Sequence, residues 1–283
     1  MILGVLGGSG LYDLDGLSEP RTEEVSTPYG APSAPIASGR IGATRLLFLP
    51  RHGRGHRYSP SEINYRANVF ALKTLGAERV LSVSAVGSLR EGLAPGQFVL
   101  PEQFIDKTFR RAATFFGDGV VGHVGFAEPT CPAFGAAVAA AAAASGRPVH
   151  RGGTYVCMEG PQFSTRAESM LHRSWGADVI GMTGATEAKL CREAEVCFSS
   201  LALVTDYDAW HAEEAAVSVE AVVAVLRANV AGAQEIIRRL GDHVAGAGPC
   251  TCARAAAHAV ITAPDAISAE ARGRLRLLHG RDP

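Results

Sequence analysis

The segment SLALVTDYDAW, residues 200–210, passes from an apolar run into two closely spaced carboxylates. Its first part, around Leu201–Val204, has the composition of a buried β-strand. Because side chains alternate along a strand, Asp206 and Asp208 are predicted to face one pocket. The segment therefore predicts a buried strand that places two acidic side chains at a binding site.

Strand and helix patterns alternate along the rest of the chain. Apolar runs predict strands at 2–6, 44–49, 79–86, 179–182 and 197–204. Helical composition or spacing predicts helices at about 59–75, 132–145, 165–175, 186–194 and 217–240. Two of them begin at capping boxes, Ser59 with Glu62 and Thr165 with Glu168. This alternation is typical of an α/β fold with a largely parallel sheet.

The chain shows no linker and no internal repeat. We therefore expect one domain whose body spans residues 1–242. The segment 243–283 contains the loop-like stretch AGAGPCTC and is expected to pack on the same domain as a C-terminal appendage.

The bulk composition excludes several classes of protein. The 283 residues are 47% hydrophobic, which is typical of a globular chain and not of a disordered one. The formal net charge of -1 argues against a nucleic-acid or lipid partner, and no apolar run reaches the length of a membrane span. The N-terminal stretch lacks the features of a signal peptide, so we expect a cytoplasmic protein.

The six cysteines carry little specific information in the sequence. Four of them, at positions 131, 157, 191 and 197, lie among apolar residues and are interpreted as inert buried thiols. Cys250 and Cys252 form a C-x-C pair in a glycine- and proline-containing loop. A single C-x-C pair supplies too few ligands for a structural zinc site, so no metal is expected.

Three loops after predicted strands contain groups that bind anions. GVLGGSG at 4–10 offers glycine amides and the Ser9 hydroxyl, although a tight turn is the simpler explanation and the dinucleotide fingerprint fails at position 13. Arg51 and His52 fit an oxyanion site, with a solvated surface arginine as the alternative. SAVGS at 84–88 lets backbone amides approach a ligand, or forms a packed turn.

The two aspartates have three interpretations from the residues alone. They cap a turn or helix, they bind a hard metal ion, or they form a carboxyl site that recognises a heterocycle. The apolar run before Asp206 and the nearby Trp210 favour partial burial, which raises the pKa of a carboxyl group. In the same way, Phe163 in EGPQFS is either a core residue or a platform for a base.

Taken together, these segments resemble the family of trimeric purine nucleoside phosphorylases and methylthioadenosine phosphorylases. The resemblance rests on GGSGLYDLDGL, TPYGAPSAP, RHGRGH, NYRANVFALK, SAVGSLRE, EGPQFSTRAES, WGADVIGMT and TDYDAW, in order over residues 2–240. It implies a three-layer α/β/α domain with a central mixed, mostly parallel sheet, assembled as a homotrimer. It also implies that inorganic phosphate, the co-substrate, attacks C1′ of a ribonucleoside while the purine leaves, without a cofactor or metal.

The resemblance also implies roles for individual residues. Phosphate binding is implied for Ser9, Arg51, His52, Ser84, Ala85 and Thr183. Nucleoside binding is implied for Met182 under the ribose, Phe163 against the base, His123 reaching a neighbouring subunit, and Asp206 and Asp208 at the purine. Specificity is implied for Ser164, Val219 and Val222.

The aspartate pair favours 6-aminopurines, because Asp206 can share a proton with purine N7 while Asp208 faces the amino group. Family members that act on 6-oxopurines carry asparagine at the place of Asp206. Val219 and Val222 cannot bond to a 5′-hydroxyl, which favours an apolar methylthio group. We therefore expect phosphorolysis of S-methyl-5′-thioadenosine to adenine and 5-methylthioribose 1-phosphate.

Several alternatives remain open at this point. One is a phosphorylase for adenosine, 6-oxopurine nucleosides, or 5′-deoxy- and 5′-halo-adenosines. Others are a nucleosidase that uses water and a non-catalytic nucleotide-binding module. The segment GMTGATEA departs from the family in carrying Thr186 in place of a proline, and Ser9 replaces the common threonine. The C-x-C pair occurs as a disulfide in heat-stable relatives, but we expect free thiols here.

Overall fold

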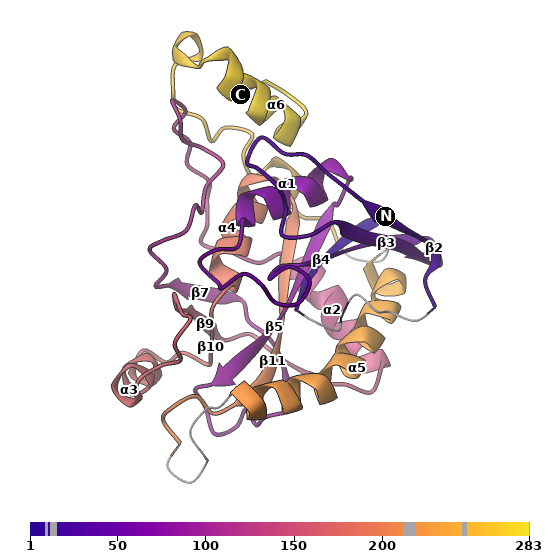
Figure 1. The fold of residues 1–283 in the computed structure, drawn as a ribbon, viewed down its shortest axis with the longest axis vertical. Coiled ribbons are helices and arrows are strands. Elements are labelled where there is room, and N and C mark those ends of the chain that lie inside the picture. The colour runs from indigo at the N-terminus through magenta and orange to yellow at the C-terminus, as the bar shows by residue number, and fades with distance from the viewer. Residues whose placement is uncertain (9–10, 12–15, 212–218, 245–247, 283) are drawn as a thin grey trace.

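The computed structural model describes residues 1–8, 11, 16–211, 219–244 and 248–282 (Figure 1). Four parallel strands form its centre: β4 (Thr44–Pro50), β1 (Ile2–Gly7), β5 (Arg79–Ser88) and β11 (Cys197–Asp206). These strands are almost entirely buried apolar residues, as expected for strands covered on both faces. Residues 200–206 thus form the end of a buried strand, as predicted.

The described strands form one mixed sheet that branches at β5. One edge continues from β4 through β3 (Ile36–Ile41) to β2 (Ser18–Glu23), and the other from β11 through β6 (Phe98–Leu100) to β8 (Val149–Arg151). The end of β5 also pairs with β10 (Val179–Gly181), which leads to β9 (Thr154–Cys157) and β7 (Gln103–Asp106). The long β5 therefore brings the ends of β10 and β11 together.

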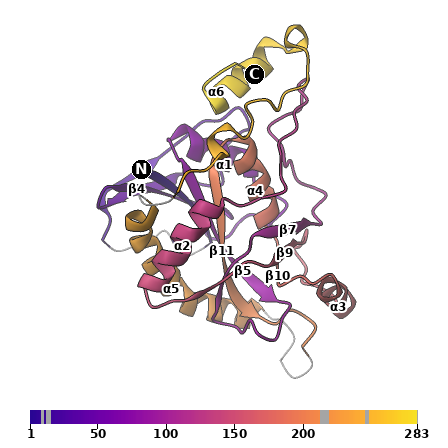
Figure 2. The ribbon, with the colours of Figure 1, turned by 180° about the vertical axis from the view of Figure 1, so that it is seen from behind.

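Helices cover both faces of the sheet and give three layers. On one face, α2 (Pro132–Ala144) and α5 (Val219–Val244) share a core cluster with side chains of β1, β4 and β11 (Figure 2). On the other face, α1 (Tyr65–Thr74) and α4 (Gly184–Glu193) share a second cluster. The helix α3 (Arg166–Ser174) stands away from these layers at the lower left of Figure 1. The expected three-layer α/β/α architecture is confirmed.

The two predicted capping boxes have different outcomes. Thr165 and Glu168 form a reciprocal capping box at the start of α3, as predicted. Ser59 and Glu62 also bond to each other, with Glu62 Oε2 accepting from the Ser59 amide at 2.9 Å, but the segment is only a turn. The helix begins at Tyr65, where Asn64 is the N-cap. The prediction of a helix start at residue 59 is wrong, because a capping box stabilises a single turn whether or not a helix follows.

The C-terminal segment packs along one end of the layers. It contains two short 3-10 turns, Cys252–Arg254 and Pro264–Ala266, and the helix α6 (Ala269–His279), which lies at the top of Figure 1. Leu278 of α6 joins the core cluster of α1 and α4. Its C-x-C pair lies beside Cys131 and Cys197, so these two cysteines do not lie among apolar residues alone, whereas Cys157 and Cys191 are buried outside this cluster, as interpreted. Among the described residues, no helix is long and apolar enough to cross a membrane.

Candidate active site

The carboxyl ends of four strands converge on most of the predicted site residues. Arg51 follows β4, Ser84 and Ala85 lie near the end of β5, and Thr183 follows β10. Asp206 is the last residue of β11 and pairs with Gly87 of β5. Ligands of open α/β sheets bind beyond the carboxyl ends of the strands. Ser9 also follows β1, but it lies outside the described residues.

Arg51 is buried and makes a network of hydrogen bonds. Its side chain is 2% exposed, and its Nε donates to Glu187 Oε1 at 2.6 Å while Nη2 donates to Oε2 at 3.2 Å. It also donates to the carbonyl oxygens of Leu6 and Val83 and to the Ser82 hydroxyl, at 2.8 to 2.9 Å. The alternative of a solvated surface arginine is therefore wrong.

Glu187 is the functional candidate that the sequence did not reveal. It lies on α4, 1% exposed, and also accepts from the Ser82 hydroxyl at 2.5 Å. Burying one charge alone costs several kcal/mol, whereas a bidentate pair with good geometry offsets most of that cost. Glu187 therefore fixes the orientation of Arg51. The only signal in the sequence was a glutamate in the first turn of a helix that follows a strand.

His52 is held as a neutral imidazole. Burial and the neighbouring Arg51 charge lower its pKa to about 4. Its Nδ1 lies 2.8 Å from the carbonyl oxygen of Tyr58, and the ring stacks on His56 at a centroid distance of 4.1 Å. A carbonyl oxygen only accepts, so Nδ1 carries the proton and Nε2 is left with a free lone pair.

Two of the predicted phosphate ligands are buried hydroxyls without a partner. Ser84 Oγ and Thr183 Oγ1 have no hydrogen-bond partner among the described residues. Thr183 is the N-cap of α4 but its side chain does not cap the helix. Since helix N-termini favour anions through their free amides and dipole, these groups form a surface complementary to an oxyanion.

Asp206 and Asp208 come together in a different way from the one predicted. The strand ends at Asp206, and Asp208 has a φ of 50°, so strand alternation does not relate the two side chains. Asp206 Oδ1 instead accepts from the Asp208 amide at 2.8 Å, closing a tight turn. A local turn therefore joins the two aspartates, and the turn-capping interpretation is partly correct.

The carboxyl chemistry of this turn suits proton transfer. Burial, opposed by a hydrogen bond from the Thr205 hydroxyl at 2.7 Å, raises the pKa of Asp206, as predicted. The neighbouring Asp208 adds to this increase, and its Oδ2 is buried with no hydrogen-bond partner in the part of the chain that the structure describes. On the far side, Trp210 Nε1 donates to the Ser88 carbonyl at 2.8 Å and so holds the turn against β5.

The loop after β9 and the residues after β10 lie together on another side of the candidate site. A Cβ added at Gly160 would lie 2.5 Å from Met182 Sδ, so this loop passes closely over Met182. Phe163 is 41% exposed, and the alternative of a core residue is therefore wrong. Ser164 is buried, with its hydroxyl 3.9 Å from Met158 Sδ.

A buried ion pair supports this side of the site. Glu159 accepts from Arg111 Nε at 3.2 Å and from the Phe109 amide at 2.7 Å, while Arg111 Nη2 donates to the Glu159 carbonyl at 2.7 Å. Arg111 also donates to the Met182 carbonyl. Arg111, in the loop after β7, thus connects the loop after β9 to Met182. This connection was not predicted, because Arg111 and Glu159 are distant in sequence.

The remaining predicted residues lie at the periphery. Val219 is the first residue of α5 and is 69% exposed, and Val222 lies one turn further along. His123 is exposed, and its amide donates to Ala259 of the C-terminal segment at 2.8 Å. That segment lies at the opposite end of the molecule from the β5 arrowhead (Figure 1), and its bond to His123 keeps this residue with it.

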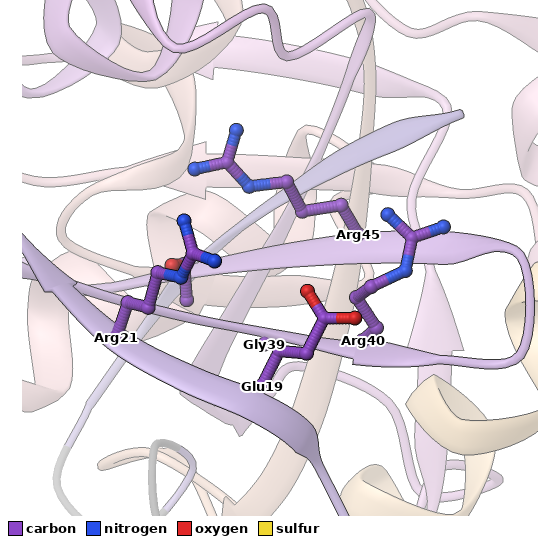
Figure 3. A pocket seen from close by; sticks show the side chains of 6 residues that line it. Glu19, Arg21, Gly39, Arg40 and Arg45 are labelled. Carbon is purple, nitrogen blue, oxygen red and sulfur yellow. The ribbon is translucent and has the colours of Figure 1, made fainter.

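A separate pocket of about 220 Å³ lies on the β2–β3–β4 edge (Figure 3). Its lining includes Arg21, Arg40, Arg45 and Glu19. Arg45 is already paired with Glu23 at 2.7 Å. None of the predicted site residues lines this pocket.

Comparisons with known proteins agree with this arrangement. Residues 2–240 match the family described as the phosphorylase superfamily. An S-methyl-5′-thioadenosine phosphorylase of Geobacter sulfurreducens is 54% identical over 280 residues, covering 99% of this chain and 98% of that protein. One of Koribacter versatilis is 49% identical and covers 99% of this chain and 96% of its own length.

Solved structures give the same result. A methylthioadenosine phosphorylase from an antarctic soil metagenomic library superposes with a TM-score of 0.92 at 46% identity, over 98% of both chains. The methylthioadenosine phosphorylase of Schistosoma mansoni in complex with adenine gives a TM-score of 0.82 at 38% identity, over 88% of this chain and 93% of that one. From the match over residues 2–240 and these full-length similarities, the chain belongs to the phosphorylase superfamily.

Proposed function

We propose that the chain catalyses the phosphorolysis of S-methyl-5′-thioadenosine to adenine and 5-methylthioribose 1-phosphate. The observation that carries this proposal is the half-buried Asp206 carboxyl of raised pKa, which lies at the same end of the central strands as the Ser84 and Thr183 hydroxyls, two groups with no hydrogen-bond partner among the described residues. An acid for the leaving base and a cradle for an anion are the two groups that phosphorolysis requires. The full-length relatives named for this activity support the same substrate.

The anion cradle is proposed to bind inorganic phosphate below the sugar. Ser84, Thr183 and the amino end of α4 donate hydrogen bonds, and Arg51 supplies a fixed positive charge. His52 has its free Nε2 as an acceptor, which suits the single hydroxyl of HPO₄²⁻. Ala85 and Ser9 complete the predicted set.

The aspartate turn is proposed to bind the purine. As phosphate forms its bond to C1′, the bond from C1′ to N9 breaks and its electron pair moves into the purine ring. Asp206 donates its proton to N7, which neutralises the departing base. Asp208 Oδ2, buried without a partner, accepts from the 6-amino group. Phe163 packs against the base and Met182 lies under the ribose.

The 5′ substituent is proposed to contact α5. Val219 and Val222 at the start of this helix offer only apolar surface to it, and Ser164 lies nearby in the proposed site. Adenosine is the second candidate substrate, because the Schistosoma mansoni enzyme is named an adenosine and methylthioadenosine phosphorylase.

The active assembly is proposed to be a cytoplasmic homotrimer in which His123 reaches a neighbouring subunit's site. Exposed apolar side chains on and beside α3 support an interface between copies. Met170 is 52%, Leu171 46% and Trp175 45% exposed. Apolar patches of this kind mark contact surfaces.

The proposal is tested by incubating the full chain with methylthioadenosine, adenosine or inosine, each with and without phosphate. We expect adenine release from methylthioadenosine only with phosphate, faster than from adenosine and much faster than from inosine. Release without phosphate would identify a nucleosidase, and a preference for inosine would contradict the role of the aspartate turn.

A further inference from the structure

Four cysteine side chains from three distant parts of the chain meet at one point. Cys131 is the N-cap of α2, Cys197 begins β11, and Cys250 and Cys252 belong to the C-terminal segment. Their Sγ atoms all lie within 4.8 Å of one another, and those of Cys197 and Cys250 are 3.3 Å apart. Three of the four residues are buried and Cys250 is exposed.

The spacing of these sulfurs matches metal coordination better than it matches disulfides. All four are free thiols, and the 3.3 Å contact is well beyond the S–S bond of about 2.05 Å. A tetrahedral Zn²⁺ with Zn–S bonds of about 2.3 Å separates its ligand sulfurs by about 3.8 Å. Small adjustments of the four side chains, with the Cys197 and Cys250 sulfurs moving slightly apart and the more distant ones moving closer, therefore produce a tetrathiolate site.

The donors and their surroundings restrict the metal and its role. An all-sulfur set of four selects thiophilic ions and is typical of zinc. Such a site has no open position for a substrate, which is the property of a structural site. The guanidinium of Arg192 lies beside it, with Nη1 4.0 Å from Cys252 Sγ, and so offsets part of the negative charge of four thiolates.

We propose that Cys131, Cys197, Cys250 and Cys252 form a structural site for one Zn²⁺. Binding forms four Zn–S bonds and releases four thiol protons to the solvent. The ion joins the start of α2, the start of β11 and the C-terminal segment. The site lies at the amino end of β11, whereas Asp206 is at its carboxyl end, so this proposal is independent of the proposed function.

The site also ties the C-terminal segment to the two central elements α2 and β11. Cys252 begins the first 3-10 turn of this segment. Shortly after the turn, the Ala256 amide donates to Glu195 Oε1 at 3.1 Å. Because the metal binds the folded arrangement only, its binding free energy adds to the stability of that arrangement. Zinc is therefore expected to protect the C-terminal segment.

The first experiment measures metal content. The full chain is purified from zinc-supplemented medium under reducing conditions and examined by elemental analysis. We expect one Zn²⁺ per chain. Replacing it with Co²⁺ is expected to give the intense sulfur-to-cobalt charge-transfer bands and visible ligand-field bands of a tetrahedral tetrathiolate. A reduced chain that takes up neither ion, with six reactive thiols regardless of added zinc, would overturn the proposal.

The second experiment compares variants of matched type. Cys252→Ser is expected to lower zinc content from one per chain to near zero, whereas Cys191→Ala, a buried cysteine of α4 outside the cluster, should keep it. Cys250→Ser removes the exposed ligand and is least disruptive to packing. Its affinity for zinc, in competition with a chromophoric chelator, is expected to fall by about 100-fold or more.

A third measurement separates zinc from oxidation. The zinc-loaded chain is denatured with a chelator, without reductant, and its thiols are counted. Six thiols are expected. A count of four or two thiols would show that disulfides have formed. If the same chain also takes up no zinc after reduction, the proposal is overturned. Zinc retained by both Cys250→Ser and Cys252→Ser with unchanged affinity would place the ion elsewhere and would also overturn it.

Discussion

Strand β11 begins at Cys197 among thiols and ends at Asp206 among carboxylates and hydroxyls. Each end of the sheet also has a buried glutamate bound by an arginine: Glu187 with Arg51 at the carboxyl end, and Glu195 with Arg281 at the amino end. Arg51 is 2% exposed, but Arg281 is 40% exposed. The carboxyl end thus keeps a charge inside the protein next to unpartnered hydroxyls, whereas at the amino end the corresponding arginine reaches solvent. The difference shows that similar ion pairs lie in different surroundings at the two ends of the sheet.

The largest expected effect is the loss of stability when each of the two ion pairs is broken separately. Glu187→Ala leaves the buried Arg51 without its partner and is expected to lower the free energy of unfolding by about 3–5 kcal/mol. Glu195→Ala leaves Arg281 free to turn into solvent and removes the acceptor of the Ala256 amide, and is expected to cost about 1–2 kcal/mol, since the arginine of this pair is 40% exposed. Urea unfolding measures both. Equal losses would show that the two pairs do not differ in the way their exposure indicates.

The next effect concerns turnover. Asp206→Asn removes the proposed proton donor and is expected to lower kcat/KM for methylthioadenosine by about 100-fold. Cys250→Ser, at the opposite end of the sheet, is the matched control and should leave turnover within about twofold of the parent at 25 °C. Initial rates of adenine release give both numbers. Unchanged turnover in Asp206→Asn would make Asp206 a turn-capping residue only.

A smaller effect is expected from the histidines as the pH falls. His52 has a pKa of about 4 in the folded protein and about 6.5 when unfolded, so its contribution to stability is present above pH 6.5 and is lost as the pH falls toward 4. This amounts to roughly 2 kcal/mol between pH 8 and pH 5.

The matched variant isolates this contribution. His52→Gln should flatten the pH dependence of unfolding in that window, while His279 at the amino end, whose pKa burial also lowers, keeps its own contribution in both proteins. Parallel stability curves for the parent and His52→Gln would contradict the neutral, buried state of His52.

The smallest effect concerns substrate choice. Val219→His places a hydrogen-bond partner at the exposed start of α5 and is expected to shift the ratio of kcat/KM values toward adenosine over methylthioadenosine by roughly tenfold. The conservative variant Val219→Ile should leave this ratio near its parent value. A ratio that does not change in Val219→His would place the 5′ substituent away from α5.

The sequence predicted the strand ends well because each is encoded locally. The apolar run before Asp206, the Arg51–His52 pair after a strand and the capping box at Thr165 are all short patterns with a clear physical basis. Burial of Asp206 and the rise of its pKa also followed from its neighbours in the chain.

The missed features are those that depend on distant residues. Glu187 lies 136 positions from Arg51, and the cysteine cluster joins residues more than 100 positions apart. Spacing along one strand gave the wrong reason for the meeting of Asp206 and Asp208, because the chain leaves the strand between them. Such contacts follow from the sheet order, which no local pattern contains.

The turn that carries the two aspartates is held by bonds within itself and by the bond from Trp210 to β5. Thr205 and the Asp208 amide both bond to Asp206, whereas the anion cradle is built on β4, β5 and α4. In the proposed function, the aspartate turn recognises the base and the cradle recognises phosphate, so the two tasks fall to separate parts of the molecule. A relative that prefers another purine could supply this short turn as a cassette, and the graft would alter the choice of base without rebuilding the machinery that binds phosphate.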